Sequence, residues 1–451
     1  MQNSSKFLII GEVYTDVHLN ELAGNQRLLR LGGIFHTARA MDALKQQYDL
    51  AYIAPGYLKE SIESFKTELN ASSVVQIGDV KNCPNVMLIT DSIEVADQGY
   101  NDLLREQSEV AFQLNDLRIL LQNNDYSDIL IYPGNYSLID LLKVIKIYKT
   151  PIHIDFQYGI NHLIMWLESG ILLETFIIST SSSYFLSECL GSSEQLIMNV
   201  GSEKAKGILL KENRGGSRFF SNGTVISTPA FLTETVHSVG VGDCFNSTFL
   251  SNIRTGKQET LSLKIASYIA SWYSSTWDHT MFKKSIENLP EDSELEALTG
   301  TSLTWEDRKK HHVYIAAPDF PDVDVRWIDK LSDSLTYHNF TPHRPVKENG
   351  LIRGNESLEQ QMTAYINDVL LLEKCSILVA VLLNDDPGTY VEIGWMAAKG
   401  KSTILFDPYK QSRNLFLRKT VNQICYTLDD VIKTVYELIA KNEQEILDAK
   451  I

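Results

Sequence analysis

The sequence lacks an apolar run long enough to cross a membrane. Its longest, Ile377 to Leu383, is far shorter than the roughly 20 residues that a membrane helix needs. The opening MQNSSKFLIIGEVYTD holds only a short apolar run before Gly11, less than the core of a secretory signal peptide. We therefore expect a cytoplasmic protein that is neither exported nor anchored.

Cysteines are few and scattered. They form no CxxC pair and no Cys and His spacing suited to zinc. An odd number of dispersed cysteines indicates reduced thiols rather than a disulfide framework, and we expect no metal site. The five are Cys83, Cys189, Cys244, Cys375 and Cys425.

Basic residues are fewer than acidic residues. There are 41 Lys and Arg residues against 57 Asp and Glu, which gives a net charge of −16 at pH 7. Such a surface repels phosphate backbones and anionic lipid, so we expect neither nucleic acid nor membranes among the partners. With 44% hydrophobic residues and no internal repeat, the chain is too apolar for a disordered protein.

Short apolar runs alternate with longer helical patterns, which is typical of α/β folds with largely parallel sheets. The polar stretch 289–311 has little periodicity and predicts a linker between one domain of residues 1–288 and another of residues 312–451. A final amphipathic helix is predicted over 428–451. The predicted strands are 7–11, 50–56, 129–134, 151–156, 176–180 and 206–212, followed by 312–318, 377–383 and 402–408.

The segment HSVGVGDCFNSTFLSNI (237–253) places two glycines and an Asp before a helical pattern. Gly240, Val241 and Gly242 would let backbone N–H groups at the start of the helix point at an anion. Asp243 stands where a general base would deprotonate a hydroxyl that attacks phosphorus. On spacing alone, the glycines can equally serve only to make a turn.

This segment resembles the Asp-Thr-x-Gly-Ala-Gly-Asp signature of the ribokinase-like (PfkB) sugar and nucleoside kinases, and the resemblance covers about residues 5–288. GEVYTD and RLGGIFHTARAMDAL resemble the first strand and Gly-Gly loop of that family. The resemblance implies Asp243 as the base, Gly240 to Gly242 as the anion hole for the γ-phosphate, and ATP and Mg²⁺ as cofactors. It also implies a substrate site at Asp16, Gly32 and Gly33.

Several positions depart from the pattern of that family. The leading Asp-Thr is His237-Ser238, which puts a monovalent-cation site in doubt, and an expected Asn is Thr37. STSSSYFLSE (179–188) lacks the Asn-x-x-Glu motif that helps to hold magnesium and phosphate, and Asn213 replaces a Gly of the nucleotide-binding turn. An active kinase and an inactive domain that senses a sugar or nucleoside both remain open.

The segment AVLLNDDPGTYVEIGWMAAKGKSTILFD (380–407) predicts a strand, a tight turn over 385–388, a helix from about Tyr390, and a strand. In that interpretation Glu392 lies in the first helical turn, where the dipole lowers the pKa of a carboxylate. An ionised Glu392 could attack the anomeric carbon of a nucleoside, and Asp386 could protonate or hydrogen-bond the leaving base. The alternative is that both carboxylates only cap the helix.

These residues resemble the Asp-x-Gly-x-x-x-Glu-x-Gly motif of the nucleoside 2-deoxyribosyltransferases, and the resemblance covers about residues 312–440. The motif residues are Asp386, Gly388, Glu392 and Gly394, followed by the Gly400-Lys401 turn. The resemblance implies Glu392 as nucleophile, Asp386 beside the base and Asp368 at the sugar. It also implies Tyr314 as the residue that orients Glu392, substrate contact at Gly388, and no cofactor for this domain.

Nucleoside 5′-monophosphate N-glycosidases share this architecture and commonly have Ser where Asp386 stands, so Asp386 favours free nucleosides. The stretch HRPVKENGLIRGN could still bring Arg344, Lys347 and Arg353 to a phosphate, or could be a solvated surface. His343, in the same stretch, could contact substrate but is expected to be structural.

Together the sequence predicts two α/β domains, ribokinase-like and then a doubly wound deoxyribosyltransferase-like one. The first hypothesis is a bifunctional enzyme: a nucleoside deoxyribosyltransferase or N-glycosidase with a kinase domain that phosphorylates a related sugar or nucleoside. The second is a hydrolase of nucleosides or nucleotides that is regulated by an inactive kinase-like domain. The third is a pair of inactive interaction modules. The expected partners are a small nucleoside, sugar or free base, and further copies in a homo-oligomer.

Overall fold

The protein is described here by a computed structural model that covers residues 6–19, 27–157, 160–352 and 355–448. The chain divides into two compact units, with the main boundary between Gly300 and Thr301; the short segment Val95–Asp97 groups with the second unit. The polar stretch that suggested a linker contains two short helices, α11 (Asp292–Ala297) and α12 (Trp305–Arg308). Leu295 and Trp305 are buried, so this stretch is folded into the units over much of its length.

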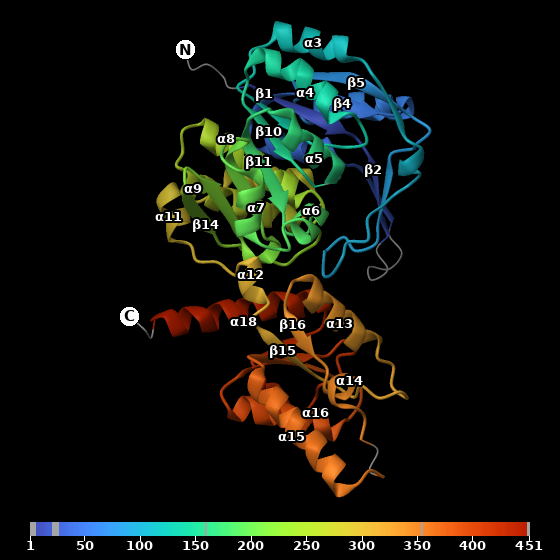
Figure 1. The fold of residues 1–451 in the computed structure, drawn as a ribbon, viewed down its shortest axis with the longest axis vertical. Helices are drawn as coiled ribbons and strands as arrows, with labels where there is room; N and C mark the ends of the chain where they lie inside the picture. The colour runs from blue at the N-terminus through green and yellow to red at the C-terminus, as the bar shows by residue number, and fades with distance from the viewer. Residues whose placement is uncertain (1–5, 20–26, 158–159, 353–354, 449–451) are drawn as a thin grey trace. The chain divides into compact units, whose positions relative to one another are not determined.

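The N-terminal unit is built on a ten-stranded sheet in the order β14-β13-β12-β11-β10-β9-β1-β4-β5-β8 (Figure 1). Pairing is parallel from β12 through to β5 and antiparallel at both edges, which confirms the predicted α/β class. All six strands predicted in this part are confirmed. The strands are β1 (Lys6–Glu12), β4 (Gln47–Ala54), β5 (Ser73–Lys81), β8 (Glu109–Phe112), β9 (Asp128–Ile131), β10 (Ile152–Asp155), β11 (Leu173–Ser179), β12 (Ala205–Lys211), β13 (Ser217–Ser221) and β14 (Thr224–Thr228).

A smaller sheet in the same unit has the order β3-β2-β6-β7. Strand β2 of this sheet follows β1 after a two-residue break. Asp16 is the second residue of β2. The strands are β2 (Thr15–Leu19), β3 (Arg27–Leu31), β6 (Val86–Ile89) and β7 (Asn101–Asp102).

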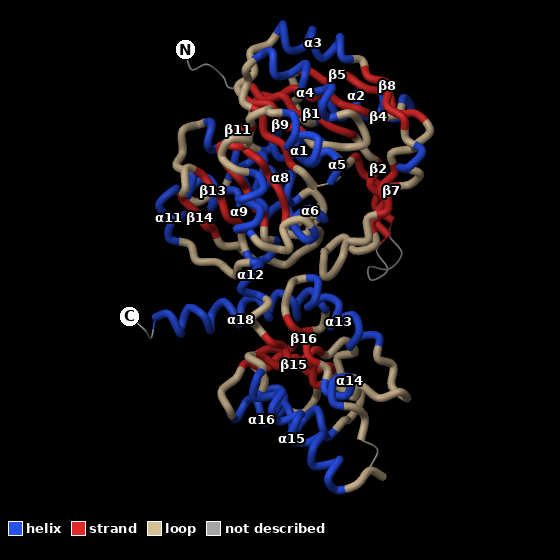
Figure 2. The backbone as a smooth tube through the Cα atoms, in the orientation of Figure 1, coloured by secondary structure: helices blue, strands red, loops and turns tan. Residues whose placement is uncertain are grey.

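Helices cover both faces of the large sheet (Figure 2). One group packs α8 against α1 and α9, and another packs α4 against α3 and α5. The helices are α1 (Ile34–Ala43), α2 (Lys59–Glu68), α3 (Leu114–Asn123), α4 (Leu138–Ile145), α5 (Ile160–Ser169), α6 (Ser183–Ser187), α7 (Ser193–Val200), α8 (Val241–Arg254), α9 (Glu259–Ser274) and α10 (His279–Glu287), with 3-10 turns at Gly56–Leu58, Arg105–Gln107, Lys146–Tyr148 and Asn213–Gly215.

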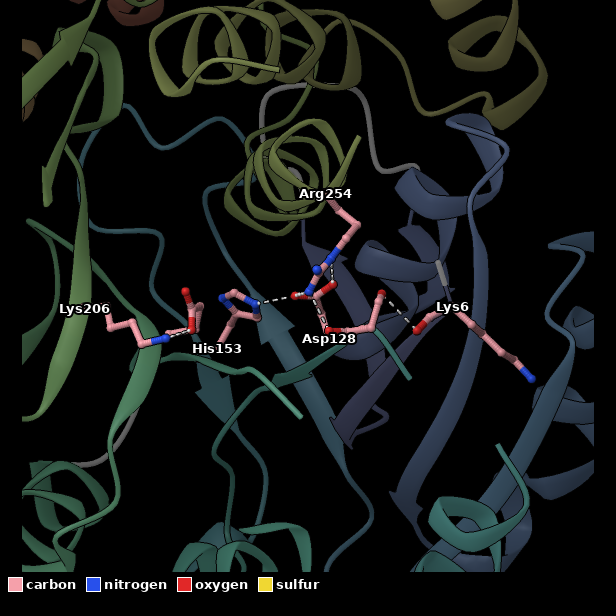
Figure 3. Close-up of polar contacts among 7 residues, drawn as sticks. Lys6, Asp128, His153, Lys206 and Arg254 are labelled. Atoms are coloured by element: carbon pink, nitrogen blue, oxygen red, sulfur yellow. Dashed lines mark hydrogen bonds and ion pairs between the residues drawn. The ribbon is translucent and has the colours of Figure 1, made fainter. Parts of the chain in front are cut away.

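A buried carboxylate anchors the last residue of α8 to the amino-terminal edge of the sheet. Asp128, at the start of β9, accepts hydrogen bonds from Arg254 Nε at 2.6 Å and Nη2 at 2.5 Å, and His153 Nε2 lies 3.1 Å from its Oδ1 (Figure 3). Hydrogen bonds to charged groups are worth about 1.5–3 kcal/mol each. The far end of α8 is therefore fixed to the strands, and its first turn is directed to their carboxyl ends.

The C-terminal unit has a five-stranded, fully parallel sheet in the order β16-β15-β17-β18-β19. The three strands and the final helix predicted for it are confirmed over the described residues. Its two edge strands, β16 and β19, were not predicted. The elements are β15 (His312–Ala316), α13 (Arg326–Tyr337), β16 (Thr341–His343), α14 (Pro345–Asn349), α15 (Leu358–Lys374), β17 (Ile377–Val381), α16 (Pro387–Ala398), β18 (Ser402–Phe406), α17 (Leu415–Thr420), β19 (Gln423–Cys425) and α18 (Leu428–Asp448).

All five cysteines are buried free thiols, as their scatter in the sequence predicted. Within the described ranges, no helix has both the length and the apolar content that a membrane span requires.

Candidate active sites

Tyr314 and Glu392 meet in the interior of the C-terminal unit. Tyr314, on β15, is fully buried and donates a hydrogen bond from its hydroxyl to Glu392 Oε1 at 2.5 Å. Burial and the neighbouring Glu392 carboxylate raise the pKa of Tyr314, so its hydroxyl remains a donor at neutral pH. The predicted orienting residue thus holds one oxygen of the predicted nucleophile.

The expected place of Glu392 in the first helical turn is wrong. Helix α16 begins at Pro387, where proline suits the first helical position, and Glu392 therefore lies in the second turn. Burial is the largest effect on its carboxyl group and raises the pKa of Glu392 to about 7, with Asp368 and Asp386 adding to the rise. The hydrogen bond from Tyr314 works in the opposite direction. Desolvation therefore sets the direction of the pKa shift, which is opposite to the lowering that the sequence suggested.

Asp386 is the N-cap of α16. Its Oδ2 accepts hydrogen bonds from Thr389 N at 2.8 Å and from Thr389 Oγ1 at 2.7 Å. A methyl group on Gly388 would lie 3.2 Å from that oxygen, so the glycine keeps the turn uncrowded. Asp386 is therefore a capping residue, and it also acts electrostatically on Glu392.

Asp368 comes to the same place from α15. Asn349 donates a hydrogen bond to its Oδ1 at 2.7 Å, and burial raises its pKa. The structure thus brings together three carboxylates, Asp368, Asp386 and Glu392. The first and the last of them are 24 positions apart in the sequence. Groups with shifted pKa values cluster at functional sites, because catalysis requires them near neutrality.

Lys401, in the Gly-Lys turn, fixes the helix that carries Asp368. Its Nζ donates to the carbonyl oxygens of Leu372 at 3.0 Å, Glu373 at 2.7 Å and Cys375 at 2.9 Å. These are carbonyls at the end of α15, where a cation satisfies both the orphan acceptors and the dipole. The turn that follows the motif therefore positions α15.

The basic residues suggested as phosphate ligands are engaged elsewhere. Arg344 donates to both oxygens of Asp319 at 2.8 Å and to Asp329 at 2.6 Å. Lys347 also contacts Asp329, at 3.4 Å, while Arg353 lies outside the described residues. His343 is buried between His312, at 2.7 Å, and Glu348, at 3.0 Å, which fits the expected structural role.

In the N-terminal unit, Asp16 and the two glycines are adjacent. A methyl group on Gly32 would lie 2.1 Å from Asp16 Oδ2, so only glycine lets the loop pass the carboxylate, and Gly33 has a φ of 61°. Burial raises the pKa of Asp16 to about 6. His36, which sequence reasoning missed, places its Nε2 3.0 Å from Asp16 Oδ2 and its Nδ1 3.1 Å from Tyr273 Oη.

The second glycine motif opens α8. Gly240 is its N-cap with a φ of 77°, and a methyl group there would lie 2.3 Å from His36 Cγ. Val241, Gly242 and Asp243 form the first turn, whose N–H groups have no partner within the helix. Burial, followed by the neighbouring Asp155 carboxylate, raises the pKa of Asp243 to about 7. The predicted anion hole and base thus lie in one helical turn.

A set of polar residues around Asp243 was missed. Asp155 Oδ2 accepts from Lys211 Nζ at 2.5 Å, Asn246 Nδ2 at 2.6 Å and Gln157 Nε2 at 3.0 Å, and Gln157 also lies 3.4 Å from Asp243 Oδ1. Asp155 and Lys211 are the last residues of β10 and β12. That position was the available signal, because ligands of α/β sheets bind at the carboxyl ends of strands.

The departures from the kinase pattern have different structural outcomes. Asn213 adopts a φ of 52°, a left-handed conformation that Asn tolerates, so the turn expected to contain Gly keeps a glycine-like shape. His237 is buried, with its two ring nitrogens 3.1 Å from Val239 O and 3.0 Å from Thr276 O. In the 179–188 segment Ser182 caps α6 and Glu188 is exposed.

These folds and sites define a two-unit α/β protein with a ribokinase-like fold followed by a nucleoside 2-deoxyribosyltransferase-like domain. The family model for nucleoside 2-deoxyribosyltransferase matches residues 313–430. An uncharacterized sugar kinase from Pyrococcus horikoshii matches 65% of this chain and 100% of its own at 18% identity, with a TM-score of 0.50. Both resemblances suggested by the motifs are confirmed at the level of fold and domain.

Two further solved structures align with the chain. Arabidopsis thaliana ribokinase complexed with ribose and ATP covers 66% of this chain and 100% of its own at 15% identity and a TM-score of 0.46. Burkholderia thailandensis nucleoside kinase in complex with inosine covers 64% and 95% at 13% identity and a TM-score of 0.48. No curated protein matches the sequence.

Any reaction in which Glu392 attacks as a carboxylate should accelerate as the pH rises through about 7, because its pKa is about 7 and only the ionised form is a nucleophile. Tyr314→Phe should move the midpoint of kcat/KM against pH upward, and Asp368→Asn should move it downward. Tyr390→Phe, on the same helix but hydrogen-bonded to Asp385 at 2.9 Å, is the matched control. Equal midpoints in all four proteins would contradict the assignment.

Proposed function

We propose that the chain is a nucleoside-processing enzyme that breaks the N-glycosidic bond of a nucleoside or deoxynucleoside at Glu392. The observation that carries this proposal is the 2.5 Å hydrogen bond from Tyr314 to Glu392, with Asp368 and Asp386 close enough to raise the pKa of Glu392. The match of residues 313–430 to the deoxyribosyltransferase family supports it.

In the first step, a Glu392 oxygen bonds to C1′ of the sugar as the bond from C1′ to the base nitrogen breaks. The transition state resembles an oxocarbenium ion, and the negative carboxylate stabilises it. Asp386 hydrogen-bonds or protonates the departing base, Asp368 binds sugar hydroxyls, and Tyr314 holds the other oxygen of Glu392. A second base or a water molecule then attacks C1′ and releases Glu392, which gives transfer or hydrolysis.

Free nucleosides fit this site better than nucleotides. A 5′-phosphate is often bound by an arginine, and Arg344 is already paired with Asp319 and Asp329. A bidentate Arg and carboxylate pair is strong and geometrically specific, so it is costly to exchange for a phosphate. The nucleotide hydrolase is the second candidate.

We propose that the N-terminal unit phosphorylates a related sugar or nucleoside with ATP. A substrate hydroxyl oxygen attacks the γ-phosphorus, its proton passes to Asp243, and the bond to the β-phosphate oxygen breaks to release ADP. The first turn of α8 supplies N–H groups to the phosphoryl oxygens. ATP use fits the cytoplasmic location that the free thiols suggest.

Magnesium would be held mainly by the phosphates of ATP. In such sites Mg²⁺ takes one or two carboxylates and several waters, and it neutralises phosphate charge. Asp155 fits as one ligand, because its Oδ1 is buried without a hydrogen-bond partner. Across the described residues, no group of three or more His, Cys, Asp or Glu side chains is arranged to hold a metal.

The glycosidic activity is tested by chromatography of a panel of nucleosides and deoxynucleosides incubated with a different free base and no ATP. We expect exchanged nucleoside, or free base and sugar, from the unaltered protein. Loss of the nucleophile in Glu392→Ala should lower the rate by at least about 100-fold. Glu373→Ala, an exposed carboxylate that pairs with Lys399, is the matched control. Equal rates in Glu392→Ala and the unaltered protein would remove the proposal.

The kinase activity is tested by ATP consumption with sugars and nucleosides. Asp243→Ala should lower it by about 10² to 10⁴, the usual contribution of a general base. Asp140→Ala, an exposed residue in the first turn of α4, should leave it unchanged. Undiminished turnover in Asp243→Ala would refute the base. No turnover in any protein, with a glycosidic rate that responds to added sugar or nucleoside, would favour the inactive sensing domain.

We also propose that the chain forms a homo-oligomer through α15. Apolar side chains at helical spacing are exposed along it, and Val391, which precedes Glu392 on α16, is 68% exposed. The segment between Gln360 and Leu372 holds one charge, Asp368, so a second copy of this acidic chain would not be repelled there. The exposed residues of α15 are Leu358, Met362, Tyr365, Ile366 and Leu370.

Light scattering on the eluted protein tests this interface. We expect a mass that is a multiple of 51.0 kDa, and a fall in that mass for the double variant Met362→Glu and Leu370→Glu, because two charges would be buried unpaired. Leu190→Glu, at a residue 82% exposed in the N-terminal unit, is the control. An unaltered protein that elutes as a monomer would contradict the proposal.

A further inference from the structure

Lys211 is a buried cation to which the motifs assigned no role. It ends β12, only 8% of it is exposed, and its Nζ lies 2.5 Å from Asp155 Oδ2. Lysine is seldom buried without a partner, and here the partner is a single carboxylate. Lys206, on the same strand, is instead exposed and pairs with Glu174 at 2.8 Å (Figure 3).

The ammonium group of Lys211 lies beside the first turn of α8. A methyl group on Gly242 would lie 3.2 Å from Lys211 Nζ, so no side chain separates the ammonium from that part of the helix. Lys211 also acts electrostatically on Asp243, whose pKa it lowers against the effect of burial. The cation, the first turn of α8 and the candidate base thus lie around one point.

Asp155 does not depend on Lys211 alone. The same oxygen, Oδ2, accepts hydrogen bonds from Asn246 and Gln157, neither of which carries a charge. Lysine is a compact charge on a flexible stem, so its ammonium can move by rotation of its own side chain. The carboxylate would keep two donors after such a movement.

We propose that Lys211 leaves Asp155 and binds the phosphoryl oxygens of a nucleotide or other polyphosphate held at the start of α8. This inference rests on the proposed kinase function and extends it. As the substrate oxygen bonds to phosphorus, its proton goes to Asp243 and the bond to the leaving phosphate breaks. Lys211 offsets the negative charge on the transferred group. The 179–188 segment has no buried carboxylate or amide that could hold a magnesium ion for the same purpose.

Calorimetric titration of the full chain with inorganic tripolyphosphate, without magnesium, tests this role. Lys211→Met should weaken binding by about 10- to 100-fold, the value of a charge-assisted hydrogen bond. Lys211→Arg should restore part of it, and Lys206→Met should bind like the unaltered protein. Asp155→Asn should bind more tightly, because Lys211 no longer has to leave a charged partner.

The single variant Lys211→Met leaves the buried Asp155 carboxylate without its ion-pair partner. The double variant Asp155→Asn and Lys211→Met removes that charge as well, so it separates an effect on binding from an effect on folding. It should melt like the unaltered protein and bind as weakly as Lys211→Met. Unchanged binding in Lys211→Met, or weaker binding in Asp155→Asn, would overturn the inference, as would no binding by the unaltered protein.

ATP turnover, measured in parallel, reports on the kinase proposal separately. Turnover with Lys211→Met equal to that of the unaltered protein would overturn the inference while the kinase stands. Loss of tripolyphosphate binding in Lys211→Met, with no turnover in any protein, would support the anion-binding role and reject the kinase.

Discussion

The hydrogen bond between Tyr314 and Glu392 is the contact on which the C-terminal site depends. It joins β15 of the parallel sheet to α16, and it forms where both side chains are largely removed from water. A carboxylate in that setting is costly to ionise, and the Tyr hydroxyl is the donor that stabilises its charged form. The remaining residues act on this pair: Asp386 caps the helix that carries Glu392, and Lys401 secures the helix that carries Asp368.

The two units share a way of building a reactive carboxylate. Glu392 and Asp243 both lie near the start of a helix, both have a desolvated carboxyl group, and both have a pKa raised to about 7 with a second carboxylate contributing. In each unit the helix start is held at the carboxyl ends of parallel strands, where open α/β sheets bind ligands. In both, desolvation of the carboxyl group is the largest cause of the pKa shift and decides its direction.

The sequence was sufficient for nine buried strands, the α/β class and the local motifs, because each depends on residues close together in the chain. It missed the small sheet and the outer strands of the two larger sheets, which are short or lack a continuous apolar run. Asp386, Gly388 and Glu392 lie within seven positions, and Tyr314 was placed only through the family resemblance. The start of α16 was misjudged because Pro387 was assigned to a turn, although proline also suits the first position of a helix. Lys211 and Asp155 are 56 positions apart, and only the order of β10, β11 and β12 brings them together.

The most direct test of the account is to trap the sugar on Glu392. Mass spectrometry after incubation with a 2′-deoxy-2′-fluoro nucleoside should find the fluorosugar on the peptide that contains Glu392, because fluorine at C2′ destabilises the oxocarbenium-like transition state and slows release. No such adduct should form in Glu392→Ala. Turnover of the analogue with no adduct on either protein, or an adduct on a different residue, would contradict Glu392 as the nucleophile.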